Sequence, residues 1–203
     1  MEKLARTFYQ EDSLVVAKAM LGAILVHETS QGKMMARIVE TEAYGGVTDR
    51  AAHSFGGRRT PRVEVMYGEA GFAYLFMIYG IHFCFNVVTN ERDVPQAVLV
   101  RAVEPLSGVD AMALRRYGKA LAALTKRDRD NLTNGPGTLC QALGLNRQHN
   151  GVDLCGDTLY LTEGDGRPFS TVSTTRIGVD YAGPAKDYPW RFYIAGNAHV
   201  SVL

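Results

Sequence analysis

The spacing of hydrophobic residues near the start of the chain predicts one short helix. Five apolar side chains recur at intervals of one, three and four residues, which places them on one helical face: Leu14, Val16, Ala17, Met20 and Leu21. Asp12 or Ser13 is suited to cap the N-terminus of this helix, and Gly22 to end it. The helix is therefore expected to begin near residue 12 and to end near residue 21.

Apolar runs after this helix predict strands. Residues 23–28 and 34–43 are expected to pair across a turn at residues 30–32, and 97–103 is a continuous apolar strand except for Arg101. A buried arginine needs a partner. The stretch 72–88 is too short and too often interrupted by polar residues for a membrane span. Aromatic and β-branched residues on both sides of Tyr79-Gly80 instead predict a β-hairpin.

The remaining elements complete a mixed α/β (α+β) pattern. Helices are expected at 108–117 and 135–143, the second capped by Thr133 or Asn134, and strands near 158–162, 191–195 and 199–203. The chain shows no repeat, low-complexity tract or linker. We therefore predict a single domain over residues 1–203, with a largely antiparallel curved sheet, flanking helices and a protruding β-hairpin.

Composition narrows the class of protein only slightly. With 203 residues, 46% apolar residues and a net charge of +1, the chain can bury a full core, and its bulk charge does not indicate a nucleic-acid partner. The three cysteines lack Cys-x-x-Cys spacing, which indicates reduced thiols. Because the N-terminal residues do not resemble a secretion signal, a cytoplasmic protein is expected, associated with the nucleoid if the source is bacterial.

Residues 37–62 contain the strongest indication of catalysis. Alternation along a strand places Ile38, Glu40, Glu42 and Tyr44 on one face. Carboxylates two residues apart on a strand are separated by roughly 6.5 Å, close enough in a partly dry site for one pKa to rise, as a general base requires. Glu40 is equally well explained as a solvated residue or half of an ion pair. The nearby aromatic, glycine and histidine residues favour a functional role for Glu42.

Two further features suggest contacts with a ligand. Arg58, Arg59 and Arg62 lie in a glycine-containing loop and could form a phosphate clamp, although an ordinary basic loop is an equal alternative. Tyr79 at a hairpin tip could insert between stacked bases or fold back into the core. A second basic stretch, residues 115–129, is interrupted by acids and is better explained as a solvated helix face. The scattered histidines match no metal motif, so neither a metal nor a cofactor is expected.

Eight motifs in order connect these features to a known family. They are Glu40-Thr-Glu-Ala-Tyr44, Ala51-Ala-His-Ser54, Gly56-Gly-Arg-Arg-Thr-Pro-Arg62, Ile78-Tyr-Gly80, Phe83-Cys-Phe-Asn86, Leu99-Val-Arg-Ala-Val-Glu-Pro-Leu106, Asn134-Gly-Pro136 and Arg176-Ile-Gly-Val179. From about Leu14 to Leu203 the chain resembles the alkyladenine (3-methyladenine) DNA glycosylase family, in particular its compact bacterial members. The resemblance implies excision of alkylated and deaminated purines from double-stranded DNA by hydrolysis of the N-glycosidic bond, without metal or lyase chemistry.

The resemblance also implies a role for each matching residue. Glu42 matches the general base, Arg101 a side chain that holds the attacking water, and the main chain at Ile177 a third water contact. Tyr44, His53 and Phe76 match the walls around a flipped base, Asn86 the residue that crowds the amine of guanine, and Tyr79 with Ile81 the intercalating tip. The chain departs from the family at Phe76, commonly a tyrosine in relatives, and at His82, where some relatives carry an aromatic residue.

Two other functions remain open from the residues alone. Paired carboxylates also suit a glycoside hydrolase acting on a carbohydrate, but that function would not explain the arginine loop or the aromatic hairpin tip. A non-catalytic module that binds damaged DNA or RNA would use the clamp and the tip, but it has no need for an acid beside an arginine. The sequence therefore favours a monomeric enzyme that binds DNA and not a membrane.

Overall fold

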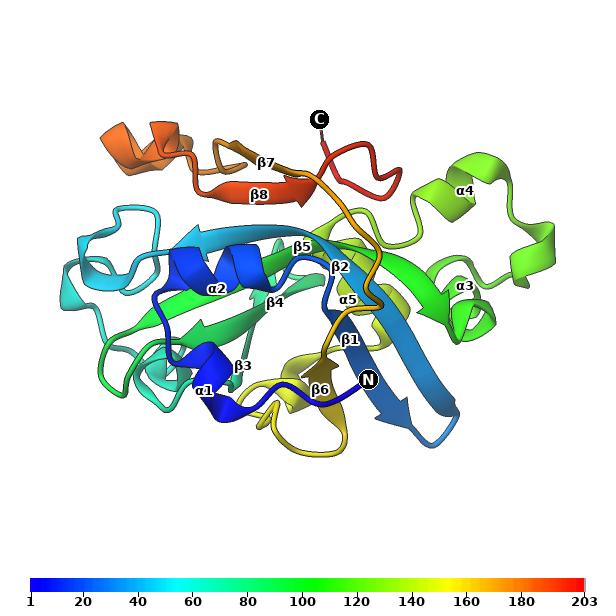
Figure 1. Cartoon of the computed structure of the whole chain (residues 1–203), viewed down its shortest axis with the longest axis horizontal. Coiled ribbons are helices and arrows are strands. Elements are labelled where there is room, and N and C mark those ends of the chain that lie inside the picture. Colours follow the sequence, from blue (N-terminus) through cyan, green and yellow to red (C-terminus); the bar gives the residue numbers. More distant parts are fainter. Residues whose placement is uncertain (203) are drawn as a thin grey trace.

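An eight-stranded antiparallel sheet is the framework of the protein, shown in Figure 1 as a computed structural model that describes residues 1–202. Six strands lie in the order β3-β4-β5-β2-β1-β6, while β8 pairs with both β2 and β7. The bounds are β1 Ile24–Thr29, β2 Gly32–Tyr44, β3 Ala73–Ile78, β4 His82–Thr89, β5 Gln96–Ser107, β6 Leu159–Thr162, β7 Thr171–Thr174 and β8 Arg191–Ile194. This arrangement confirms the predicted mixed α/β fold with an antiparallel sheet.

Short helices surround this sheet. The α-helices are α1 Arg6–Tyr9, α2 Ser13–Ala19, α3 Val109–Tyr117, α4 Lys126–Asp130 and α5 Pro136–Leu143. The 3-10 helices are η1 Gly46–Thr48, η2 Phe55–Gly57, η3 Glu64–Tyr67, η4 Leu121–Ala123, η5 Arg147–His149 and η6 Asp180–Asp187. Helix α2 packs on β2 and β5, and α5 packs on β4 and β5. Their buried faces share one core with the sheet, which fixes the position of β2 and β5.

The first predicted helix and the hairpin are both confirmed. Asp12 caps α2, because its carboxylate accepts a hydrogen bond from the Leu14 amide. Strands β3 and β4 pair as far as Ile78 and His82, so the turn consists of residues 79–81. Within residues 1–202, no helix is long and apolar enough to cross a membrane.

The predicted cap of α5 was wrong. Gly135 occupies the cap position, and Pro136 begins the helix with a backbone geometry that suits a first turn. The two predicted caps make other contacts, since the Thr133 hydroxyl donates to the Val103 carbonyl and the Asn134 amide donates to Asn131. No side chain caps this helix, because the cap position is occupied by a glycine.

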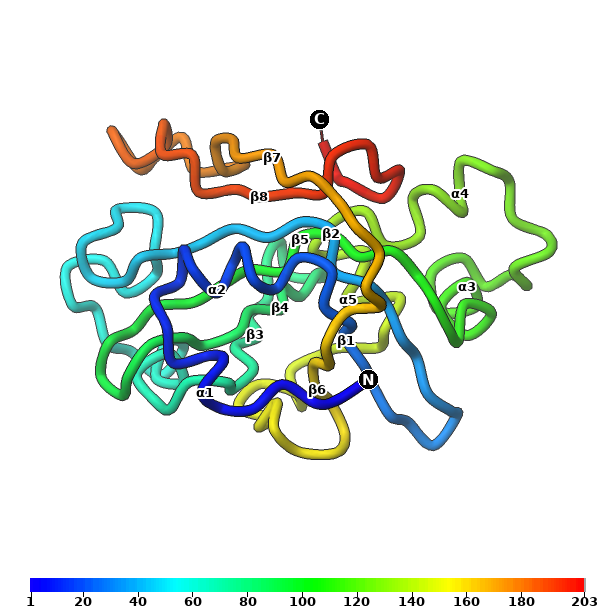
Figure 2. The backbone as a smooth tube through the Cα atoms, viewed as in Figure 1, coloured from blue at the N-terminus to red at the C-terminus, as the bar shows by residue number. Residues whose placement is uncertain are grey.

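The prediction of a last strand at 199–203 was also wrong, because residues 199–202 form no strand. Leu203 lies outside the described residues. Side chains take the place of a strand partner here. The Ser201 amide donates to Glu40, and the Val202 carbonyl accepts from Arg191. Besides β2, the strand that pairs with β8 is β7, which the sequence did not predict. Figure 2 shows the chain crossing from β6 to β7, where the Arg167 carbonyl accepts from Arg37 of β2.

An irregularity between β2 and β5 positions the polar residues of the sheet. Ile38 pairs with Val103 and Glu40 with Ala102, which leaves Val39 without a partner on β5. Thr41 then pairs with Val100, so Arg101 is the unpaired residue on the opposite strand. Such bulges change the direction of side chains. Arg101 is therefore placed beside both carboxylates of β2.

Candidate active site

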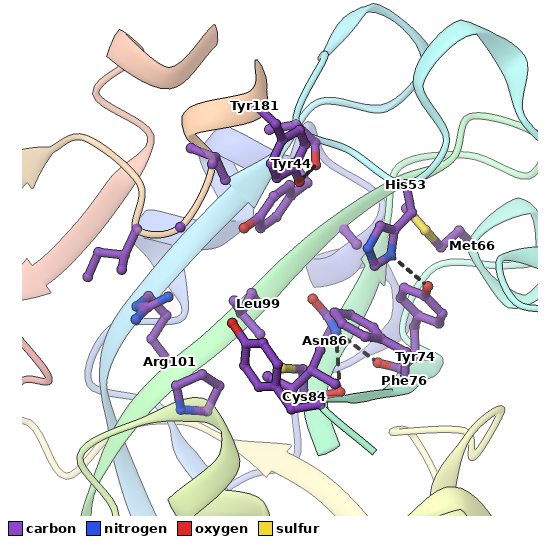
Figure 3. A pocket seen from close by; sticks show the side chains of 18 residues that line it. Tyr44, His53, Met66, Tyr74, Phe76, Cys84, Asn86, Leu99, Arg101 and Tyr181 are labelled. Atoms are coloured by element: carbon purple, nitrogen blue, oxygen red, sulfur yellow. Dashed lines mark hydrogen bonds between the residues drawn. The ribbon is translucent and has the colours of Figure 1, made fainter. Parts of the chain in front are cut away.

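A cavity of about 360 Å³ lies between β2, β5, the β3–β4 hairpin and η6. Its lining includes seven residues that the sequence singled out: Tyr44, His53, Phe76, Tyr79, Asn86, Arg101 and Ile177. Figure 3 shows Tyr44 and Tyr181 on one side of this cavity, with His53, Tyr74 and Phe76 on the other. A volume in the range of about 300–1,000 Å³ is typical of small-ligand sites. The fold thus brings together residues that lie up to 133 positions apart, from Tyr44 to Ile177.

One wall consists of three aromatic rings. The ring centroids of His53 and Phe76 are 4.5 Å apart in an edge-on arrangement, and His53 Nδ1 lies 2.9 Å from the Tyr74 hydroxyl. Burial, assisted by the charges of Arg62 and Arg58, lowers the pKa of His53 to about 4. The imidazole is therefore neutral at pH 7. The sequence did not single out Tyr74, although it lies on the same hairpin strand as Phe76.

The facing wall is formed by Tyr44 and Tyr181. The Tyr44 hydroxyl donates to Glu42 Oε2 over 2.8 Å, which fixes the ring at the end of β2. Tyr181 is 69% exposed, and its hydroxyl donates to the Ala51 carbonyl over 3.1 Å. Sequence reasoning missed Tyr181, although it lies only two residues after the Arg176-Ile-Gly-Val179 motif. A flat ligand has aromatic surfaces available on both sides.

Asn86 supplies a buried polar group to the cavity. Its side-chain nitrogen donates to the Tyr74 carbonyl over 3.1 Å and lies 3.4 Å from the Cys84 carbonyl (Figure 3). Because both amide hydrogens are committed to backbone carbonyls, the amide oxygen is the group left for a ligand. The side chain is held in place from its own hairpin.

Glu42 is fully buried, and its carboxylate contacts three residues that line the cavity: Tyr44, Arg101 and Ile177. The Ile177 amide donates to Oε1 over 2.8 Å, the Tyr44 hydroxyl donates to Oε2 over 2.8 Å, and Arg101 Nη1 lies 3.3 Å from Oε1. Burial raises the pKa of Glu42 above its ordinary value, although Arg101, the Ile177 amide and the Tyr44 hydroxyl oppose the rise. Glu40 adds a smaller upward effect. Such a raised pKa is typical of a general base or acid.

Glu40 is also fully buried, and its carboxylate is one partner of an ion pair, which was one of the sequence-based alternatives. Arg191 Nη1 donates to Oε1 over 2.7 Å, and Arg101 Nε donates to the same oxygen over 3.1 Å. The Ser201 amide donates to Oε2 and its hydroxyl to Oε1. The sequence did not predict that Arg191 and Ser201 contact Glu40. The only indication of a buried partner was an arginine beside the apolar residues of β8.

The hairpin tip projects a large aromatic side chain into solvent. Tyr79 is 89% exposed and Ile81 73% exposed, so Tyr79 does not fold back into the core. The backbone of Tyr79 has a φ of +52°, a left-handed conformation that bulky residues rarely adopt. Strained residues of this kind are concentrated at functional sites. Tyr79 also lines the cavity, so the tip and the cavity form one continuous surface.

Comparison with known proteins identifies the family. The family model for methylpurine-DNA glycosylase matches residues 7–198. The chain belongs to the methylpurine-DNA glycosylase family. It is 55% identical over 202 residues to a protein of Desulfitobacterium hafniense, with 100% of both chains covered. It is 51% identical over 201 residues to one of Clostridium acetobutylicum, covering 99% of this chain and 98% of the relative, and 49% identical to one of Clostridium novyi, covering 99% of each. All three relatives carry the name "Putative 3-methyladenine DNA glycosylase".

Family membership confirms the resemblance inferred from the eight motifs. It also confirms the predicted class of enzyme, because a DNA glycosylase is a hydrolase that acts on N-glycosyl bonds. A DNA substrate follows from the same class. Within residues 1–202, no group of three or more histidine, cysteine, aspartate or glutamate residues is arranged to hold a metal ion.

The basic loop of this glycosylase uses its arginines in different ways. Arg59 pairs with Glu64 at 2.6 Å and with Asp93 at 3.0 Å. In the described part of the chain, Arg58 and Arg62 are exposed and form no ion pair, and Arg62 lies over the Phe76 ring at 5.0 Å. Arg58 and Arg62 are thus the members of the predicted clamp that remain available to a phosphate.

Proposed function

We propose that this chain is a monofunctional DNA glycosylase that removes alkylated or deaminated purines from double-stranded DNA and so starts base excision repair. Candidate bases are 3-methyladenine, 7-methylguanine, hypoxanthine and ethenoadenine. The observation that carries the proposal is a cavity of about 360 Å³ between aromatic walls, with the fully buried Glu42 in contact with residues that line it. The enzyme is proposed to act as a monomer.

Base recognition would rely on stacking between Tyr44 and His53, with Phe76 at the edge. Each base–aromatic contact is worth about 1–3 kcal/mol. The neutral state of His53 supports this role, since an uncharged ring does not repel a base that carries a positive charge after alkylation. Asn86, held rigidly by its two carbonyl contacts, would exclude guanine by crowding its exocyclic amine.

Hydrolysis would use a water molecule activated by Glu42. The water oxygen attacks C1′, its proton passes to Glu42, and the electron pair of the N-glycosidic bond leaves with the purine. Each carboxylate oxygen accepts more than one hydrogen bond, so Glu42 keeps acceptor capacity beyond the contacts from Tyr44 and Ile177. Arg101 would hold the water and balance the charge of Glu42.

Access to the base requires its extrusion from the duplex, at a cost of a few kcal/mol. The exposed ring of Tyr79 is suited to fill the vacated stack, with Ile81 beside it. Arg58 and Arg62 would hold phosphates near the cavity mouth, which predicts that binding weakens with salt.

The two other functions are less well supported. A glycoside hydrolase needs two carboxyl groups that face its substrate, but the four donors around Glu40 leave it enclosed within the protein. A binding module on this scaffold would gain nothing from burying Glu42 beside Arg101, because buried charges carry a large desolvation cost.

Single-turnover release of free base tests the proposal. Duplexes carrying hypoxanthine or 3-methyladenine would be incubated with wild-type protein and with Glu42→Gln, in the presence of a chelator. We expect release by wild type alone, with duplex binding retained by the variant. Release at equal rates by both proteins would remove Glu42 from its role, and binding without release by wild type would favour the non-catalytic module.

A further inference from the structure

We propose that Glu40, held by Arg191 and Ser201, is the positioning residue for Arg101. The inference rests on the proposed function, because Arg101 matters to catalysis only if it serves Glu42 and its water. Glu40 touches no ligand in this scheme and acts entirely through the arginine.

The two carboxylates of β2 contact different edges of one guanidinium. Arg101 Nε donates to Glu40 over 3.1 Å, and Nη1 of the same group lies 3.3 Å from Glu42. A planar guanidinium held at two edges has little freedom to rotate. Glu40 thus fixes the plane in which Arg101 presents its remaining donors to the cavity.

Arg191 prevents Glu40 from competing with Glu42 for that cation. The site contains two buried carboxylates and two buried arginines, and the stronger contact of Glu40, at 2.7 Å, is with Arg191. A single arginine shared by two carboxylates would be drawn toward one of them, since an uncompensated buried charge is costly. With Arg191 present, the positive charge of Arg101 remains available to Glu42.

Ser201 completes this support from the C-terminal segment. Its amide donates to Glu40 Oε2 over 2.7 Å and its hydroxyl to Oε1 over 2.9 Å. Arg191 Nη1 also donates to the Val202 carbonyl over 2.9 Å. Both oxygens of Glu40 are therefore held, and the carboxylate cannot turn away from Arg101.

Glu40→Gln tests the inference, with Glu104→Gln as the matched control. Glu104 also lies in this sheet and pairs with an arginine, Arg167, at 3.0 Å, outside the network of Glu40. Single-turnover excision, duplex affinity and thermal unfolding would be measured across pH. Misplacement of a catalytic group by about 1 Å costs on the order of 10²-fold in rate, so we expect a loss of that size for Glu40→Gln, with unchanged duplex affinity. Glu104→Gln is expected to match wild type.

The pH profile reports whether the charge of Glu40 acts on Glu42, and thermal unfolding separates this effect from general loosening of the fold. The charged and titratable neighbours of Glu42 are Glu40, Tyr44, Cys84, Arg101, Arg176, Tyr181 and its strand partner Arg191. Because the charge of Glu40 raises the pKa of Glu42, its loss should move the acid limb of the rate profile to lower pH. General loosening would also reduce the rate, and it is recognised by a lower thermal unfolding temperature and a weaker duplex affinity.

Ser201→Ala provides a second variant that preserves all charges. We expect a several-fold slower excision at an unchanged unfolding temperature, with recovery in Ser201→Thr, which keeps the hydroxyl. Wild-type rates in both Glu40→Gln and Ser201→Ala would overturn the inference and leave the proposed function intact. Absence of base release by wild type would overturn the proposed function, and the inference with it.

Discussion

The guanidinium of Arg176 lies over the ring of Tyr44, 4.9 Å from its centroid, and supports it from within the protein. Arg176 is itself held by a fully buried ion pair with Asp49 and by the carbonyls of Ala43 and Ala185. It also precedes Ile177, whose amide holds Glu42. One buried arginine thus connects a wall of the cavity with the segment that holds Glu42.

Replacing Arg176 by methionine should destabilise the protein strongly. The change leaves Asp49 as an uncompensated buried charge, for which the expected loss in the free energy of unfolding is about 3–5 kcal/mol. Chemical denaturation of Arg176→Met checks the magnitude. The double variant with Asp49→Asn should recover part of the loss, and a single-variant loss below about 1 kcal/mol would show that the pair is not important for stability.

Removing the Tyr44 hydroxyl should change the pH dependence of excision. Its hydrogen bond favours the ionised form of Glu42, so Tyr44→Phe should raise the pKa of Glu42 further while keeping the aromatic face. Because the base must be ionised to accept a proton, activity that depends on it is lost at a higher pH as the solution is acidified. Single-turnover rates across pH measure this displacement, and an unchanged acid limb would contradict it.

Tyr79→Gly should reduce excision from duplex DNA without reducing the stability of the protein. Glycine adopts a positive φ without the cost of about 1–2 kcal/mol that other residues incur, so the variant should unfold no more easily than wild type. Excision from duplex DNA should nevertheless fall, because nothing would fill the vacated stack. Denaturation and single-turnover assays check both parts, with a single-stranded substrate as control. Equal losses of activity on the two substrates would argue against intercalation by Tyr79.

Salt dependence should distinguish the arginines of the basic loop. If Arg58 contacts a phosphate, Arg58→Gln should reduce the slope of log affinity against log salt by about 1. Arg59→Gln is the matched control, because Arg59 already pairs with Glu64 and Asp93 and should leave the slope unchanged. Binding titrations at several salt concentrations provide the slopes. A larger change for Arg59 would reverse the two assignments.

Local pattern was sufficient to predict the parts of the site that depend on neighbouring residues. The β2 strand, the turn at Tyr79 and the capped helix α2 all follow from spacing and turn chemistry within a few residues. Family resemblance then assigned the lining residues, which the cavity does bring together.

Contacts between distant segments could not be predicted in this way. Glu40 and Ser201 are 161 positions apart, and no spacing rule relates a strand carboxylate to a serine amide near the other end of the chain. The same contact explains the wrong strand at 199–202, since apolar alternation indicates a strand but does not identify the partner of each amide. The bulge at Arg101 could not be predicted for a similar reason, because the pairing register depends on both β2 and β5.

The two aromatic walls of the cavity belong to different parts of the chain. Tyr44 and Tyr181 come from the end of β2 and from η6, whereas Tyr74 and Phe76 come from β3. A base held between them would connect these segments by contacts that the free protein lacks. Since a ligand that binds only the folded state raises the free energy of unfolding, a bound lesion would act as a removable cross-link, and product release would return the protein to its less stable, ligand-free form.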